Sequence, residues 1–208
     1  IFPLDNPPRN ISAYIGFDLT AKSLHVGSLI QLMVLKILKE NGHKVCVLLG
    51  ESTSEVGDPS GKSKERNMLS TDEITTNRNG IEKAIRGILG DDTVFVSNKS
   101  WFNDNLSFMN FVTSFGKHFS INRMLSLQSV QSRLENNSNL SFLEFCYSLM
   151  QSVDFFHLNQ NNGVNVQIGG SDQWGNIVSG IDLIRRMNGN EVFAFTTPLL
   201  LEKNGEKM

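Results

Sequence analysis

The chain has 208 residues, with 19 basic and 21 acidic side chains and a net charge of −2, so no global basic field draws it onto nucleic acid or an anionic membrane. Its 2 cysteines are too few for a disulfide framework or a metal cluster, and a reducing compartment is expected. The apolar runs are too short to span a bilayer. We expect one compact, soluble unit, truncated at both ends because it starts at Ile1 and stops in a polar loop at Met208.

Strand-like and helix-like segments alternate along the sequence. In chain order we expect a strand at 12–17, a helix at 24–38, a strand at 45–49, a helix at 71–89, a strand at 94–96, helices at 103–115 and 141–156, a strand at 164–168, a helix at 171–187 and a strand at 192–195. This alternation predicts an α/β fold with a doubly wound parallel sheet. In such sheets ligands bind beyond the carboxyl ends of the strands.

The first strand–helix connection carries a candidate anion site. His25 and Ser28 lie one turn apart near a predicted helix start, where free N–H groups and the positive end of the helix dipole favour a phosphate. Thr20 and Asp18 lie just upstream, and Asp18 could act as a polar anchor or simply cap the turn. A solvated histidine at a helix start is the alternative.

The loop 57–62, with the sequence GDPSGK, follows the second predicted strand. Its glycines are too close together for a Walker A phosphate loop, which argues against a P-loop NTPase. Asp58 suits a substrate ammonium group, while Lys62 and Arg66 could hold phosphate oxygens. The same residues could also form an ordinary surface turn.

Three polar residues share one face of the helix predicted at 141–156. Tyr147, Gln151 and Asp154 are spaced by four and then three residues, on a helix that is otherwise largely apolar. Burying unpaired polar groups is costly, and a polar ligand would relieve that cost. An internal hydrogen-bond network without a ligand is the competing interpretation.

The segment 167–175, with the sequence QIGGSDQWG, leads from a predicted strand into a helix. Its glycines permit close backbone approach, and Asp172 is placed to bond ribose hydroxyls or to cap the helix. Gln173 could bond a substrate, and Trp174 could wall a pocket or pack in the core.

Four segments taken together resemble a known family. Residues 24–28 (LHVGS) look like the HIGH signature of class I aminoacyl-tRNA synthetases, and residues 14–18 (YIGFD), 57–61 (GDPSG) and 167–174 (QIGGSDQW) are similar to the bacterial and organellar tyrosyl-tRNA synthetases. The resemblance covers nearly the whole chain. It implies a Rossmann-like catalytic domain over residues 1–208, with an inserted helical region at about 103–160 that includes a dimer interface.

The resemblance also implies a reaction and a set of roles. L-tyrosine would be activated by ATP with Mg²⁺ to tyrosyl-adenylate and transferred to tRNA(Tyr), with no protein-bound metal, prosthetic group or covalent enzyme intermediate. The tyrosine site would comprise Tyr14, Asp58, Tyr147, Gln151, Asp154, Gln167 and Gln173. The ATP site would comprise Asp18, His25, Gly27, Ser28, Gly170, Asp172 and Lys207. Catalysis by charge stabilisation would fall to His25, Thr20, Lys62 and Arg66.

The chain departs from the family pattern in two places. Ser28 stands where the signature usually has its second histidine. Residues 205–208 (GEKM) look like the start of a KMSKS loop whose later lysine is absent, as are the tRNA-binding parts expected downstream. We therefore expect this chain to bind tyrosine but to charge tRNA poorly or not at all.

Two other functions remain open from the sequence. Another class I adenylyl or nucleotidyl transferase, with tryptophanyl-tRNA synthetase the nearest, would share the His25 region but would not need the polar trio of the helix 141–156. A non-enzymatic RNA-binding or scaffolding relative is the other, and the mild acidity of the chain argues against it. By resemblance, residues 111–124 would lie near a homodimer interface, in a bacterial cytoplasm or an organelle matrix.

Overall fold

The computed structural model describes residue 8 and residues 10–60, 68–103 and 106–200. Within them, a parallel sheet has the order β3-β2-β1-β4-β5. The strands are β1 (Ser12–Asp18), β2 (Lys44–Gly50), β3 (Phe95–Ser97), β4 (Val166–Gly170) and β5 (Phe193–Thr197). β1 is central, since Ala13 pairs with Val45 on one side and with Val166 on the other. The predicted parallel α/β fold is confirmed.

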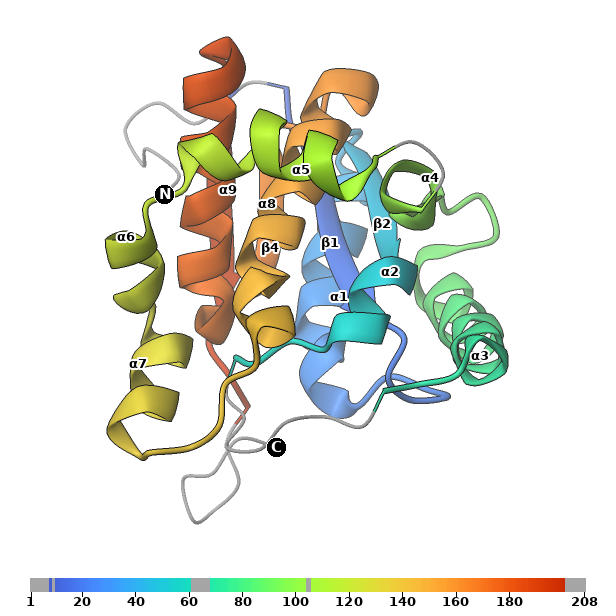
Figure 1. Cartoon of the computed structure of the whole chain (residues 1–208). Coiled ribbons are helices and arrows are strands. Elements are labelled where there is room, and N and C mark those ends of the chain that lie inside the picture. Colours follow the sequence, from blue (N-terminus) through green and yellow to red (C-terminus); the bar gives the residue numbers. More distant parts are fainter. Residues whose placement is uncertain (1–7, 9, 61–67, 104–105, 201–208) are drawn as a thin grey trace.

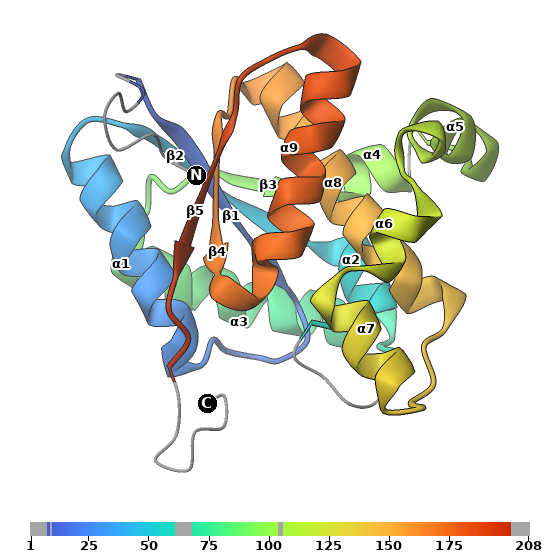
Figure 2. The same cartoon turned by 90° about the vertical axis from the view of Figure 1, so that its left-hand side faces the viewer.

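Helices cover both faces of this sheet (Figures 1 and 2). Helices α1 (Val26–Glu40) and α3 (Thr71–Leu89) pack on one face, and α8 (Phe142–Asn162) and α9 (Trp174–Asn188) pack on the other. The shorter helices are α2 (Glu51–Val56), α4 (Lys99–Phe102), α5 (Phe108–Ser114), α6 (Ile121–Leu125) and α7 (Gln128–Glu135), and 3₁₀ turns lie at Gly116–His118 and Ser171–Gln173. Helices α4 to α8 thus lie on the crossover from the edge strand β3 to β4.

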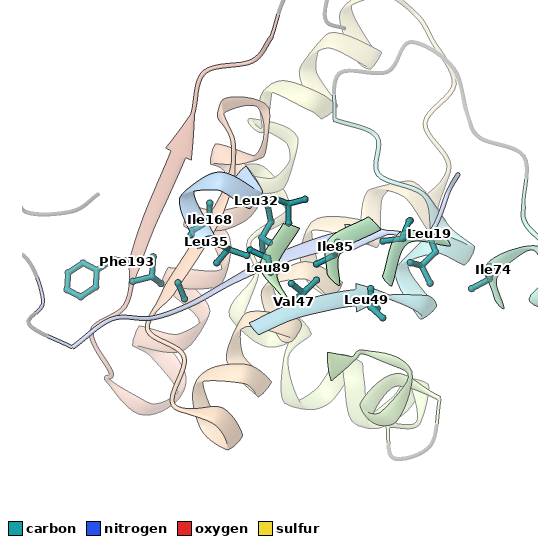
Figure 3. Close-up of a cluster of buried hydrophobic side chains, with 14 residues drawn as sticks. Leu19, Leu32, Leu35, Val47, Leu49, Ile74, Ile85, Leu89, Ile168 and Phe193 are labelled. Carbon is teal, nitrogen blue, oxygen red and sulfur yellow. The ribbon is translucent and has the colours of Figure 1, made fainter. Parts of the chain in front are cut away.

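Each face of the sheet has its own apolar cluster. Figure 3 shows the one under α1 and α3, where Leu35 and Ile85 meet Val47 of β2, and all three side chains are inaccessible to solvent. Full burial of each such side chain contributes roughly 1.5–3 kcal/mol. β2 is covered on both sides, which is why residues 45–49 form a continuous apolar run in the sequence.

The helix boundaries follow local sequence signals. Ser70 and Glu73 form a capping box at the start of α3, and Ser141 and Glu144 form another at the start of α8. Helix α3 covers the range that the sequence predicts. Helix α8 was expected to end at residue 156 but continues to Asn162, because Gly163 supplies a left-handed cap at φ 64°.

Other boundaries predicted from the sequence are wrong in detail. The helix expected at 103–115 starts later, as α5 at Phe108, and a separate short helix, α4, ends before it at Phe102. The strand expected at 164–168 forms as β4 two positions later in the chain, at Val166–Gly170. The glycine-rich loop expected after the second strand begins with a short helix, α2, and α6 and α7 carry no apolar repeat long enough to reveal them.

The strand order creates one reversal in the sheet. From β1 the chain moves outward to β2 and β3, and it then returns to the other side of β1 to form β4 and β5. The carboxyl ends of β1 and β4 are therefore neighbours whose following connections leave in opposite directions. A crevice at such a switch point is the usual ligand site of an open parallel sheet.

Candidate active site

A cavity of about 260 Å³ opens at the carboxyl ends of β1 and β4. Every predicted site residue that the structure describes lines it: Tyr14, Asp18, Thr20, His25, Gly27, Ser28, Asp58, Tyr147, Gln151, Asp154, Gln167, Gly170, Asp172 and Gln173. Lys62, Arg66 and Lys207 lie outside the described residues. Trp174 is not in the lining and is 41% exposed, so both of its expected places, pocket wall and core, are wrong.

The innermost part of the cavity, which we call the buried end, is formed by Tyr14, Asp154 and Gln167. Tyr14 comes from the middle of β1 and Gln167 from the adjacent position of β4, while Asp154 reaches in from α8. Their exposed fractions are 0%, 2% and 3%. The Tyr14 Oη and Gln167 Oε1 atoms are buried without a hydrogen-bond partner among the described residues. Such atoms favour a ligand that brings its own donor or acceptor.

Asp154 is held by two donors from the chain that follows β3. The Trp101 Nε1 atom donates to Oδ1 at 2.9 Å, and the Asn98 Nδ2 atom donates to Oδ2 at 3.2 Å. Burial raises the pKa of Asp154 well above its ordinary value, these two hydrogen bonds oppose the rise, and the nearby charge of Asp18 adds to it. The structure thus fixes a buried carboxyl group at the bottom of the cavity, with one hydrogen bond from the protein to each of its oxygens.

The Tyr14 hydroxyl is kept neutral by the same surroundings. Burial raises its pKa well above the ordinary value, with further contributions from Asp154 and Cys46. Its ring packs against Phe155 at a centroid distance of 5.4 Å. A neutral phenol hydroxyl next to a carboxyl group can donate one hydrogen bond and accept another, as recognition of a ligand hydroxyl requires.

Asp18, at the end of β1, joins the cavity to α2 and α8. Tyr147 donates its hydroxyl to Asp18 Oδ2 at 2.8 Å, and Thr53 donates to Oδ1, also at 2.8 Å. Burial raises the pKa of Tyr147 well above its ordinary value, and the charges of Asp18 and Asp58 raise it further. Tyr147 and Asp18, expected in the tyrosine and ATP sites respectively, are therefore direct partners.

A second polar network surrounds Asp58. The Ser60 N–H donates to Asp58 Oδ1 at 2.8 Å, and Gln173 Nε2 donates to Asp58 Oδ2 at 2.7 Å. Asn176 Nδ2 reaches Gln151 Oε1 at 3.0 Å and Gln173 Oε1 at 3.3 Å. Burial raises the pKa of Asp58, the hydrogen bonds from Ser60 and Gln173 lower it, and the charge of Asp172 adds a smaller rise.

The outer part of the cavity, which we call the open end, is formed by Thr20, His25 and Gly27. His25 is exposed and is the N-cap of α1, with its Nδ1 atom accepting from the Gly27 N–H at 3.0 Å. An added Cβ at Gly27 would lie 2.6 Å from the imidazole ring, so only glycine lets the ring fold over the helix start. The helix N-terminus and the imidazole together favour an anion.

The charge of the cavity is uneven. Four carboxyl groups line it, from Asp18, Asp58, Asp154 and Asp172, and no lysine or arginine lines it within the described part of the chain. The walls therefore suit a ligand ammonium group. The described residues also contain no group of three or more His, Cys, Asp or Glu side chains placed to hold a metal ion.

Sequence reasoning missed the residues that hold the predicted ones. Asn98 and Trp101 fix Asp154, and Asn176 links Gln151 to Gln173. Asn98 is fully buried and follows the carboxyl end of a predicted strand, which was a usable indication. Asn176 lies three positions after Gln173, and nothing in the sequence indicates that its side chain is buried, with 4% of it exposed.

Comparisons with known proteins point to one family. The family described as tRNA synthetases class I (W and Y) matches residues 6–208. The chain is 54% identical over 198 residues to the tyrosine–tRNA ligase of Anaplasma phagocytophilum, covering 95% of this chain and 48% of the relative. It is 51% identical over 205 residues to the tyrosine–tRNA ligase of Pelagibacter ubique, covering 96% of this chain and 50% of the relative. The chain thus spans about half the length of the curated relatives that it matches.

Solved structures show the same architecture. The C-terminally truncated mitochondrial tyrosyl-tRNA synthetase of Aspergillus nidulans has a TM-score of 0.81 at 31% identity, over 95% of this chain and 63% of that one. The tryptophanyl-tRNA synthetase of Aeropyrum pernix K1 has a TM-score of 0.67 at 20% identity, over 96% of this chain and 51% of that one, and shows the fold alone. No helix among the described residues is both long and apolar enough to cross a membrane.

Proposed function

The chain belongs to the class I tRNA synthetases of the tryptophan and tyrosine group, and we propose that its cavity binds L-tyrosine and ATP and joins them as tyrosyl-adenylate. The observation that carries this proposal is the buried end. There the buried carboxyl group of Asp154 lies with the Tyr14 hydroxyl and the Gln167 amide oxygen, neither of which has a partner among the described residues. A phenol hydroxyl can donate to Asp154 and accept from Tyr14, whereas a phenyl ring would leave these polar atoms unsatisfied.

The other walls fit the rest of the amino acid. Asp58, held by Ser60 and Gln173, offers a carboxylate for the substrate ammonium group, with Tyr147 and Gln151 beside it. Tyrosine placed in this way directs its own carboxylate toward the open end. ATP would occupy that end, with its ribose near Gly170 and Asp172 and its phosphates at Ser28 and the start of α1.

The reaction then needs no protein nucleophile. The tyrosine carboxylate attacks the α-phosphorus of ATP, the bond to pyrophosphate breaks, and tyrosyl-adenylate forms. His25 and Thr20 would stabilise the charge that develops on the phosphates, together with Lys62 and Arg66. Mg²⁺ would enter with ATP as part of the substrate. Transfer to tRNA(Tyr) would follow by attack of a terminal ribose hydroxyl on the activated carbonyl, with AMP leaving.

Calorimetric titration with L-tyrosine, L-phenylalanine and L-tryptophan tests the specificity. We expect saturable binding of tyrosine alone, and ATP–pyrophosphate exchange that depends on tyrosine. Tighter binding of tryptophan would replace the proposal by tryptophan activation, and binding of RNA without either amino acid or ATP would favour a non-enzymatic role.

Because the chain spans about half of its relatives, we propose that it charges tRNA(Tyr) poorly on its own. Robust aminoacylation by these 208 residues would contradict that part.

We also propose a homodimer built on the region 103–160. Supporting it are large apolar side chains that α5 and α6 leave exposed, namely Phe108 at 69%, Met109 at 63% and Ile121 at 59%. Exposed apolar side chains such as these would be covered at an interface between two copies of the chain. Sedimentation velocity should report a dimer that dissociates in Phe108→Asp, and a wild-type monomer would contradict the proposal.

A cytoplasmic location is proposed from the bacterial relatives.

A further inference from the structure

We propose that helix α3, which supplies none of the predicted substrate-binding residues, is the platform that positions the connection 19–25 between β1 and α1. The connection carries Thr20 and ends at His25, the N-cap of α1. The position of the connection relative to the sheet is set by two positioning residues on one face of α3, Asn77 and Gly80. The inference rests on the proposed function for its effect on rate, but its structural content can be tested independently.

Asn77 makes the first contact. It is a buried amide, 6% exposed, and its Nδ2 atom donates to the carbonyl oxygen of Leu19 at 2.8 Å. On the other side of the same residue, the Leu19 N–H donates to the Ser54 hydroxyl of α2 at 2.6 Å. Both backbone polar groups of Leu19 are thus taken by side chains from two different helices. Leu19 itself is fully buried, so the start of the connection is fixed from three directions.

Gly80 makes the second contact, one turn along α3. A Cβ added to Gly80 would overlap the carbonyl oxygen of Lys22 and lie 3.1 Å from its carbonyl carbon. The atoms in the way belong to the backbone and cannot rotate aside as a side chain would. The connection therefore rests directly on the helix, and only glycine permits this distance.

The helix cannot easily retreat from the connection. Ile81 and Ile85, on the same side of α3, are 1% and 0% exposed and belong to the core beneath the sheet, and Ile81 also lines the cavity. A capping box fixes the start of the helix at Ser70. A side chain at position 80 would thus move the connection rather than the helix, and it would displace Thr20 and His25 from the phosphates.

The decisive experiment compares Gly80→Ala with Gly87→Ala. Both glycines lie in α3 and both substitutions gain the same helix propensity, but a Cβ at Gly87 meets nothing within 4 Å. A misplacement of about 1 Å costs about 100-fold in rate, so we expect Gly80→Ala to slow tyrosine-dependent ATP–pyrophosphate exchange at least about tenfold. Tyrosine affinity should stay within about twofold, because the buried end is untouched, and Gly87→Ala should match the wild type in both.

A second pair removes the hydrogen bond instead of adding bulk. Asn77→Asp keeps the side-chain size but leaves no donor for the Leu19 carbonyl, and Asn79→Asp makes the same charge change at an exposed position of the same helix. We expect the rate of tyrosine-dependent ATP–pyrophosphate exchange to fall in Asn77→Asp and to stay at the wild-type value in Asn79→Asp.

Amide hydrogen exchange of residues 19–25, followed by mass spectrometry, reads the position of the connection without any catalysis. Faster exchange there in Gly80→Ala and Asn77→Asp, but not in their controls, is the expected result. If the wild type does not activate tyrosine, the proposed function fails while this comparison still decides the platform. The inference would be overturned if Gly80→Ala and Gly87→Ala showed the same amide hydrogen exchange at residues 19–25 and the same rate of ATP–pyrophosphate exchange.

Discussion

The two ends of the cavity are built in different ways. At the buried end, Tyr14, Asp154 and Gln167 come from two strands and a long helix, and all are almost inaccessible to solvent. At the open end, Thr20, His25 and Gly27 lie on a connection and a helix start, and His25 is exposed. Regular, packed elements thus shape one end, while a connection resting on α2 and α3 shapes the other.

This difference assigns each end a separate part of the energetics. The polar atoms of the buried end lose their contact with water when the protein folds, which costs free energy. A ligand that forms hydrogen bonds with these atoms recovers part of that free energy and therefore binds selectively. The open end offers N–H groups, a helix dipole and an imidazole to charge that develops during the reaction. Substitutions at the buried end should change affinity and selectivity, and substitutions at the open end should change rate.

The largest expected effect is on rate, from His25→Asn. Asparagine is a good N-cap, so the start of α1 is preserved while the imidazole is lost. Loss of one stabilising donor costs about 100-fold or more in rate, so tyrosine-dependent ATP–pyrophosphate exchange should fall by that factor with the tyrosine Kd unchanged. His43→Asn, at the end of the same strand–helix unit, is the control. A weaker tyrosine Kd with a normal rate would reverse the roles of the two ends.

Asp154→Ala should produce the next largest effect, and on affinity. A hydrogen bond to a charged group contributes about 1.5–3 kcal/mol, which corresponds to roughly 10- to 100-fold in the tyrosine Kd. Phenylalanine, which has no hydroxyl, should bind about as it does to the wild type, so the preference for tyrosine narrows. Ser152→Ala, a buried change on the same helix, serves as the control in parallel calorimetric titrations. Equal losses for both amino acids would mean that Asp154 only supports the fold.

The same contrast explains what the sequence could predict. Strand β1 and helix α3 are strongly patterned, α3 also begins at a capping box, and both were predicted to within one residue. The candidate residues of both ends were gathered from four segments far apart in the chain, and the structure brings together all of them that it describes. Motif resemblance and the rule that parallel strands carry ligands at their carboxyl ends were sufficient for that.

The supporting residues were not predictable in the same way. Trp101 lies in the one-turn helix α4, where no periodicity exists, and its role depends on α8 folding across it. Asn77 lies among polar residues in the sequence of α3, and only its hydrogen bond to the Leu19 carbonyl distinguishes it from them. Contacts between residues 50 or more positions apart follow from tertiary packing, which local patterns do not encode.

Acidification should weaken tyrosine binding by about tenfold through Asp58. Its pKa is raised from 3.8 by burial, so the carboxylate that attracts the ammonium group is protonated, and the attraction lost, at a pH above that ordinary value. Tyrosine titrations at falling pH should show the loss before the pH reaches the ordinary value of 3.8, since the substrate ammonium stays charged throughout. Asp58→Asn should bind weakly at every pH and flatten the profile. An unchanged slope in this variant would assign the pH dependence to another group.

Trp101→Phe should have the smallest effect and tests whether the buried end depends on its supporting residues. Phenylalanine keeps a ring against His157, which stacks on the indole at 5.2 Å, but removes the Nε1 donor to Asp154. One net hydrogen bond contributes about 0.5–1.5 kcal/mol, so the tyrosine Kd should rise roughly 2- to 10-fold. Because that bond lowers the pKa of Asp154, the loss should grow as the pH falls. Trp174→Phe makes the same change at an exposed residue outside the cavity, and identical binding by the two variants would show that Asp154 needs no support from Trp101.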